Sequence, residues 1–197
     1  MPVYITPYYN SEGPEINVGT HSKDLAAATA ESIIDLSAKM KADWETLSVA
    51  TMYVMSIRLY DLGRKNDAVY WFYSAQFRMR LLRSLLSDDS IGEIGSEGFE
   101  LIHAHKAFHQ LAGEYINGYG FGDLHTLEET VRLVKSENGH PPKFKTIYPD
   151  LQFIDEQSWP GKNKEVSDAI DFLLDYISNN ADDIKAKRKA NGIEGKY

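Results

Sequence analysis

Three histidines stand close together in the segment ELIHAHKAFHQLAGEY, and their type and spacing suggest metal binding or acid–base chemistry. His105 and His109 are four residues apart, so on a helix they would lie on one face and could share a ligand. His103 would point elsewhere: measured around the helix from Leu101, it lies at about 200°, whereas His105 lies at about 40°. Two imidazoles make an incomplete metal site. A third ligand would have to come from another part of the chain, and the candidates are His125, Asp123 and Glu31.

The same angles also support a structural interpretation of these histidines. His105 falls inside an apolar stripe with Leu101 and Phe108, and His109 falls at the edge of that stripe. This arrangement predicts a buried, hydrogen-bonded His105 beside a boundary His109, with no cofactor. The alternative is a metal-dependent enzyme centred on His105, His109 and His125.

Other reactive motifs do not meet the structural context that they require. GYGFGD, residues 118–123, would suit a phosphate at the start of a helix, but no strand precedes it and no lysine follows at P-loop spacing. We interpret it as a linker. The chain has no cysteine, which excludes thiolate nucleophiles and disulfides. The patterns G-x-S-x-G, H-E-x-x-H and G-x-x-x-x-G-K-[ST] do not occur. The sequence therefore favours a protein that is not an enzyme.

The elements that must carry these residues are mainly helices. Hydrophobic periodicity and cap signals predict an all-α, or mainly α, fold: a six-helix bundle or a short helical-repeat-like stack, with a small N-terminal β-hairpin. We expect a single domain over residues 1–197, with an extended hairpin segment over 1–21 and a helical body over 22–190. An irregular proline-rich loop is expected over 139–162, followed by one helix from near Asn163 to about Ala190.

The segment LYDLGRKNDAVYWFYSAQFRMRLL, residues 59–82, carries the clearest structural signal. Gly63 ends one helix, and the helix after it is apolar on two sides: Ala68, Phe72, Ala75, Met79, Leu82 and Leu86 lie on one, and Tyr70, Phe77, Leu81 and Leu85 on the other. Such a helix must be covered on both sides. The hairpin around Gly63 is therefore predicted to be interior framework. Arg83 falls within the first apolar side, which predicts an ion pair with a carboxylate such as Asp61, or an anchor for an anionic group.

This hairpin resembles one tetratricopeptide repeat, or one repeat of the related Sel-one type, over Val49 to Leu82. The small and large residues of that family's spacing are matched by Leu59, Gly63, Ala68, Phe72 and Ala75, and the run Ala68, Trp71, Phe72, Ala75 is similar to the Sel-one pattern A-x-x-W-Y-x-x-A-A. The chain departs from the pattern at Gln76, at Met55 and Ser56, and at Arg80, and it shows no second clear copy. The resemblance implies a helical scaffold that binds proteins or peptides in a concave groove.

Charge narrows the expected partners. The formal net charge is -8, which disfavours nucleic acid and anionic membranes because both require a cationic face. The N-terminus lacks the basic and apolar regions of a signal peptide, and no apolar run approaches the ~20 residues of a membrane span. We therefore expect a cytoplasmic protein.

These observations predict a non-catalytic protein-binding module, loosely similar to the bacterial immunity proteins and antitoxins that neutralise a toxin by occlusion. The expected partner is a protein, with a basic toxin domain as one form, and a homodimer and an adaptor role in a larger assembly stay open. Aromatic and acidic residues on loops are the expected contacts: Tyr8, Tyr9, Tyr119, Phe121, Asp155, Glu156 and Trp159. Trp159 has a second interpretation, as a plug that pins its loop to the bundle.

Overall fold

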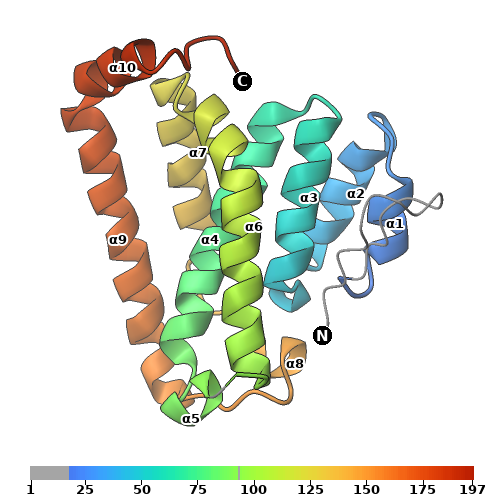
Figure 1. The fold of residues 1–197 in the computed structure, drawn as a ribbon. Coiled ribbons are helices and arrows are strands. Elements are labelled where there is room, and N and C mark those ends of the chain that lie inside the picture. The colour runs from blue at the N-terminus through green and yellow to red at the C-terminus, as the bar shows by residue number, and fades with distance from the viewer. Residues whose placement is uncertain (1–17, 93) are drawn as a thin grey trace.

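The computed structural model describes residues 18–92 and 94–197, which form a mainly helical body (Figure 1). The α-helices are, in order, α1 (Ser22–Ala27), α2 (Ser32–Ala42), α3 (Val49–Asp61), α4 (Lys65–Leu85), α5 (Asp88–Ile91), α6 (Glu97–Gly120), α7 (Leu124–Glu137), α8 (Phe144–Ile147), α9 (Trp159–Asn179) and α10 (Ala181–Ala190). Single 3₁₀ turns, η1 (Trp44–Thr46) and η2 (Glu156–Ser158), precede α3 and α9. The predicted mainly α fold is confirmed, but the described residues form ten α-helices where six were expected.

The predicted N-terminal hairpin, over residues 1–21, lies almost wholly outside the described residues, and so do Tyr8 and Tyr9. Within the described part of the chain there is no β-strand. Pairing of the β type is limited there to a bridge between Leu86 and Phe153.

Helices α3 and α4 form the hairpin at the centre of the molecule. Ser48 caps the start of α3, because its side-chain oxygen accepts a hydrogen bond from the backbone N–H of Thr51 at 3.1 Å. Gly63 ends the helix with φ +79, a left-handed conformation that glycine adopts without strain. The N–H of Arg64 then donates to the carbonyl oxygen of Leu59 at 2.8 Å. This bond pairs one of the carbonyl groups that the end of a helix leaves without a partner.

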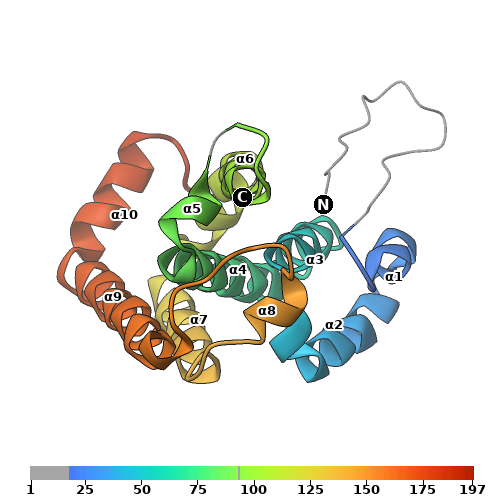
Figure 2. The ribbon, with the colours of Figure 1, turned by 90° about the horizontal axis from the view of Figure 1, so that it is seen from below.

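Helix α4 packs against α3, α6, α7 and α9. Seen from below, it lies in the middle of the helices, with α3 on one side and α9 on the other (Figure 2). Phe72 and Phe77, from its two apolar sides, are 0% and 2% exposed. The prediction that this hairpin is interior framework is confirmed.

The C-terminal helix differs from its prediction. Helix α9 begins at Trp159, inside the segment expected to be an irregular loop, and ends at Asn179. Asn180 leaves the helical conformation and its side-chain amide donates to the carbonyl oxygen of Tyr176 at 2.8 Å. Asparagine competes in this way for backbone groups, so it turns the chain into α10. Although α6 and α9 are long, no described helix is apolar enough over a sufficient length to cross a membrane.

The buried arginine is Arg78, whereas the sequence placed Arg83 in the apolar interior. Arg78 is 1% exposed and Arg83 is exposed. The guanidinium of Arg78 donates through Nη1 to the carbonyl oxygen of Leu47 at 2.7 Å and lies 4.7 Å from the ring centre of Trp44. Burial lowers the pKa of Arg78 to about 10, which still leaves it charged at neutral pH. The expected ion pair between Arg83 and Asp61 is not formed.

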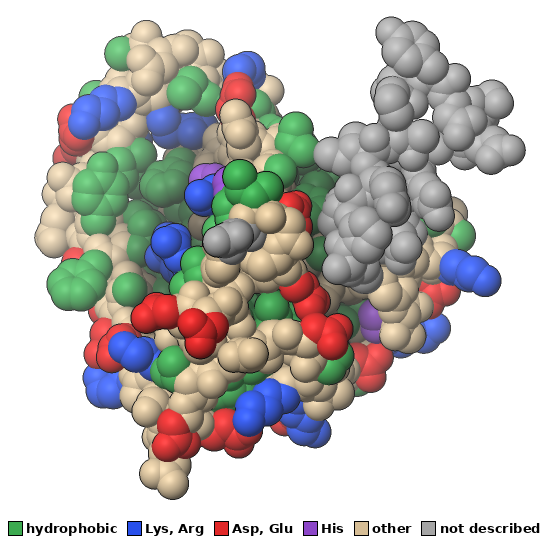
Figure 3. All heavy atoms as spheres, turned by 60° about the horizontal axis from the view of Figure 1, so that its bottom comes forward, with side chains coloured by type: hydrophobic (Ala, Val, Ile, Leu, Met, Phe, Trp, Pro, Cys, Tyr) green, Lys and Arg blue, Asp and Glu red, His purple; other side chains and the backbone are tan. Residues whose placement is uncertain are grey.

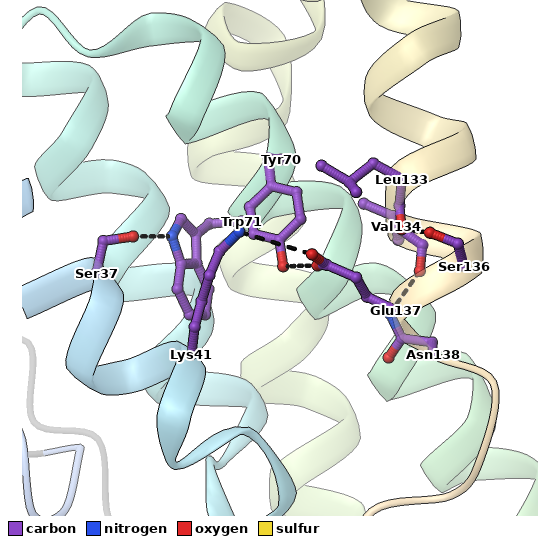
Figure 4. A network of polar contacts seen from close by, with 9 residues as sticks. All are labelled: Ser37, Lys41, Tyr70, Trp71, Leu133, Val134, Ser136, Glu137 and Asn138. Atoms are coloured by element: carbon purple, nitrogen blue, oxygen red, sulfur yellow. Dashed lines mark hydrogen bonds and ion pairs between the residues drawn. The ribbon is translucent and has the colours of Figure 1, made fainter.

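A polar network joins α2, α4 and α7 (Figure 4). The hydroxyl of Tyr70 donates to the carboxylate of Glu137, and Nζ of Lys41 lies 3.9 Å from the other carboxylate oxygen. The indole N–H of Trp71 donates to the side-chain oxygen of Ser37 at 2.9 Å. Two neighbouring aromatic residues of α4 therefore fix α7 on one side and α2 on the other.

Candidate functional site

The loop residues predicted to contact a partner lie at opposite ends of the molecule. Tyr119 and Phe121 are at the C-terminal end of α6, whereas Asp155 and Glu156 lie beside η2, near the other end of that helix (Figure 1). A helix of 24 residues is about 36 Å long. The described members of the predicted contact set therefore do not form one surface.

Several of these residues also have structural partners. The hydroxyl of Tyr119 donates to the side-chain oxygen of Asn66 at 2.9 Å, and Glu156 forms an ion pair with Lys145 at 2.5 Å. Asp155 caps η2 by accepting from the N–H of Gln157 at 3.1 Å.

Trp159 is the clearest correction to the predicted contact set. It is only 8% exposed, and its indole N–H donates to the carbonyl oxygen of Ile154 at 3.1 Å. Its ring packs against those of Phe144 and Phe153. Trp159 therefore pins its loop to the bundle, as its second interpretation expected, and presents little surface to a partner.

The histidines do not assemble into a metal site. His103 is exposed, as the helical angles indicated, but His105 is only half-buried and His109 is exposed, so both are more open than predicted. His125 lies on α7 with an exposed side chain 3.4 Å from Glu129. Among residues 18–92 and 94–197, no three histidine, aspartate or glutamate side chains are grouped closely enough to hold a metal ion. The alternative centred on His105, His109 and His125 lacks its third ligand.

The structure instead brings His105 and His109 into a groove of about 420 Å³ between α4 and α6. Each helix contributes four residues at the spacing i, i+3, i+4, i+7: Gln76, Met79, Arg80 and Arg83 from α4, and Ile102, His105, Lys106 and His109 from α6. This spacing places each set on one helical face, so the two faces line the two sides of the groove. We call these eight residues the cationic groove. Figure 3 shows the hollow, with Lys, Arg and His side chains gathered in it.

The charge of the groove is opposite to that of the protein as a whole. No described carboxylate lines it, and Arg80, Arg83 and Lys106 form no ion pair with a described acidic residue. The chain has a net charge of -8, so three such cations at one hollow are a local reversal of sign. Arginine presents a planar fork that matches carboxylate or phosphate oxygens. The groove is therefore suited to an anionic group.

His105 is held at the edge of the groove by the core. The hydroxyl of Tyr53 lies 2.7 Å from Nδ1 of His105, and the Tyr53 ring stacks on Phe108 at a centroid distance of 5.4 Å. Burial, with smaller contributions from the positive charges of His109 and the groove arginines, lowers the pKa of His105 to about 4. Burial also raises the pKa of Tyr53, which keeps its proton. A neutral ring that accepts at Nδ1 from Tyr53 carries its proton on Nε2, as a further donor for an anion.

The groove continues onto an apolar surface of α9. A smaller hollow is lined by Gln76 and Arg80 of the groove and also by Ala169 and Leu173 of α9. Four α9 residues at the spacing i, i+3, i+4, i+7 share this side of the helix, and we call them the α9 stripe: Ala169, Phe172, Leu173 and Tyr176. Phe172 is 75% exposed and Tyr176 is 49% exposed. The cationic groove and the α9 stripe together form what we call the trough.

The trough exists because its two walls pack on the same helix. Both α6 and α9 pack on α4, whereas no extensive packing joins α6 to α9 in the described structure. Helix α10 connects the walls at one end, where Arg188 donates to the carbonyl oxygen of Gly118 of α6 at 2.7 Å. Figure 2 shows α9 and α10 curving around the side of α4 that faces away from α3.

Another hollow, of about 540 Å³, lies along a different side of α6. Its lining includes the carboxylates of Asp43, Glu97 and Glu100, together with His21, whose ring lies 3.3 Å from Asp43. Helix α6 thus carries acidic residues beside one hollow and basic residues beside the other. The net charge of the whole chain does not reveal that α6 has acidic residues beside one hollow and basic residues beside the other.

Comparison with known proteins identifies no family for this chain. No family model matches the chain, and no solved structure matches it. The chain is 27% identical over 123 residues to an uncharacterized protein of Haemophilus influenzae, which covers 60% of this chain and 45% of the relative. The chain thus spans less than half the length of that relative.

The sequence contained part of the signal for this site. Arg83 stood out as an anchor for an anionic group, and His105 and His109 as a pair on one face. Arg80 and Lys106 were missed, because each looks like an ordinary polar residue on its own helix. Only the packing of α6 on α4 brings the two sets together.

Proposed function

We propose that this protein is a non-catalytic protein-binding module that holds a segment of a partner protein in the trough. The observation that carries the proposal is the trough itself: a concave surface between α6 and α9, both packed on α4, with cations on α4 and α6 and exposed aromatic residues on α9. Exposed aromatic side chains and arginine are the residue types that contribute most binding energy at protein interfaces.

The resemblance of the α3–α4 hairpin to a tetratricopeptide or Sel-one repeat supports the proposal, because such scaffolds bind peptides on a concave face. In biological terms we propose an immunity or antitoxin role, in which the module occludes the working surface of a toxin. An adaptor role in a larger assembly uses the same surface.

Affinity capture with two matched variants tests the proposal. The tagged chain is used to capture proteins from an extract of its source organism, alongside Gln76→Trp and Gln157→Trp. Gln76 lies in the floor of the trough, so a tryptophan there fills the space that the partner needs. Gln157 is exposed beside Asp155 and Glu156, the acidic part of the predicted loop surface.

We expect one stoichiometric partner that is lost with Gln76→Trp and kept with Gln157→Trp. Loss with Gln157→Trp alone would place the interface on the loops and refute the trough. Recovery of no stoichiometric partner would refute the binding function, provided that circular dichroism shows all three proteins to be folded.

A further inference from the structure

We propose that the segment that enters the trough is an amphipathic helix of the partner, with carboxylates on one face and apolar side chains on the other. This inference rests on the proposed function and specifies the chemistry of what is bound. It follows from three features of the trough: the sign of its charge, the position of its apolar wall and its dimensions.

The charge of the trough selects carboxylates. Arg80 and Arg83 are three residues apart on α4, so their guanidinium groups lie on the same face, and Lys106 faces them from α6. Two arginine forks beside an ammonium suit two or three carboxylates at the spacing of neighbouring helical turns. Gln76 adds an amide beside them. A partner segment with lysine or arginine at these positions would be repelled.

The apolar wall lies along a different side of the trough from the cations. Phe172 and Tyr176 of the α9 stripe are exposed, whereas Leu173 is half-buried. A segment that fits both walls must therefore carry its carboxylates and its apolar side chains on different faces. Residues spaced i, i+3, i+4, i+7 on a helix provide that separation.

The dimensions of the trough favour a helix over an extended strand. The groove residues span eight positions along each helix, and the seven steps between the first and the last cover about 10 Å at 1.5 Å per residue. Three helical faces line the trough, and side chains at helical spacing interdigitate best with another helix. An extended strand would instead present unpaired backbone groups to side chains, with no sheet edge to receive them.

Selection from a peptide library tests the inference. Random 16-residue peptides displayed on phage are selected on the wild-type chain and, in parallel, on Arg80→Glu/Arg83→Glu and on Lys23→Glu/Lys39→Glu. The two double variants change the net charge equally. Lys23 and Lys39 are exposed residues of α1 and α2, away from the trough. Enriched peptides are then labelled with fluorescein, and their affinities are measured by fluorescence anisotropy.

We expect peptides rich in Asp and Glu that bind Arg80→Glu/Arg83→Glu at least ten times more weakly than the wild type. Their affinity for Lys23→Glu/Lys39→Glu should stay within twofold. A scrambled peptide of the same composition should bind at least tenfold more weakly than the selected one, because it loses the two faces.

The inference is overturned by any of four results: no enrichment, enrichment of neutral or basic peptides, equal binding of the scrambled peptide, or tighter binding of a 20-nucleotide single-stranded DNA. It is also overturned if sedimentation shows a homodimer that Arg80→Glu/Arg83→Glu dissociates, because the occupant is then a second copy. If these results appear while Gln76→Trp still abolishes capture of a partner, the proposed function stands and only the chemistry of the segment is wrong.

Discussion

The hydroxyl of Tyr53 lies 2.7 Å from Nδ1 of His105, and this pair joins the interior of α3 to the edge of the cationic groove. Tyr53 is fully buried, whereas His105 is only half-buried. A residue of the core thereby fixes the ring that borders the groove. Changes at this pair should affect both the stability of the protein and the order of the groove.

Removing the hydroxyl should destabilise the fold. Tyr53→Phe leaves Nδ1 of His105 without its partner, and we expect a loss of about 1–2 kcal/mol in the free energy of unfolding. Tyr60→Phe is the matched control on the same helix, since Tyr60 is half-buried and its hydroxyl forms no hydrogen bond with another described residue. Urea denaturation followed by circular dichroism measures both. Equal effects of the two variants would contradict the role of this hydrogen bond.

Stability should fall as the pH falls below neutrality, in part through His105. Burial lowers the pKa of His105 from 6.5 to about 4, so between these values the unfolded chain binds a proton that the folded chain does not. The contribution of His105 is therefore complete above about pH 6.5 and is lost as the pH approaches 4. We expect a loss of about 1–2 kcal/mol, because partial exposure of the ring reduces the effect.

His105→Gln separates this contribution from those of other titrating groups. Urea denaturation at pH 7.5, 6 and 5 should show a smaller decrease in unfolding free energy for the variant than for the wild type. Parallel decreases for the two proteins would show that His105 titrates normally.

Truncation of a phenylalanine should destabilise the protein strongly at one position and hardly at all at another. Phe72→Ala opens a cavity beside α3 in the central hairpin and should cost about 3–5 kcal/mol. Phe172→Ala removes a ring that is 75% exposed and should change stability by less than about 0.5 kcal/mol. Thermal denaturation distinguishes them. A large loss with Phe172→Ala would show that the α9 stripe is structural, which would weaken its assignment as a binding surface.

Replacement of glycine by alanine should destabilise the protein at one position and stabilise it at another. Gly63→Ala forces a side chain into φ +79 and should cost about 1–2 kcal/mol. Gly161→Ala lies in the first turn of α9 with open space around it, and should stabilise the protein by about 0.5–1 kcal/mol. The two melting temperatures should shift in opposite directions, and a neutral Gly63→Ala would contradict the left-handed helix end.

The buried arginine should contribute through its packing more than through its charge. Arg78→Ala leaves a cavity beside Trp44 and an unpaired carbonyl at Leu47, so we expect a loss of about 2–4 kcal/mol. Arg78→Met keeps most of the volume without a buried charge and should be about 2 kcal/mol more stable than the alanine variant. Equal losses in chemical denaturation would instead assign the stability to the guanidinium.

The sequence was most informative where a helix is covered along its whole length. The two apolar sides of α4 were read from angles alone, and Phe72 and Phe77 are buried as expected. The same angles failed for Arg83, which shares a face with Phe72. That face is covered at Phe72 but opens into the groove at Arg83. Hydrophobic periodicity indicates the direction in which a side chain points. It does not indicate how far along the helix the neighbouring elements cover that face.

The other features could not be predicted, because they depend on contacts between segments that are far apart in the sequence. Arg78 is buried against Trp44 and Leu47, which lie some thirty positions earlier in the chain. The charge of the groove was hidden for the same reason, since Arg80 and Lys106 meet only through the packing of α6 on α4. Asp155 and Tyr119 were grouped by residue type, although the length of α6 separates them.

The hydrogen bond from Arg188 to Gly118 makes one end of the concave surface different from the other. With α9 and α6 tied together by α10 at that extremity, the two ends of the surface differ, and a bound peptide would meet different surroundings at its two ends. Its own N-to-C polarity would then be distinguishable, so reversing a bound peptide's sequence should abolish recognition even though its composition is unchanged.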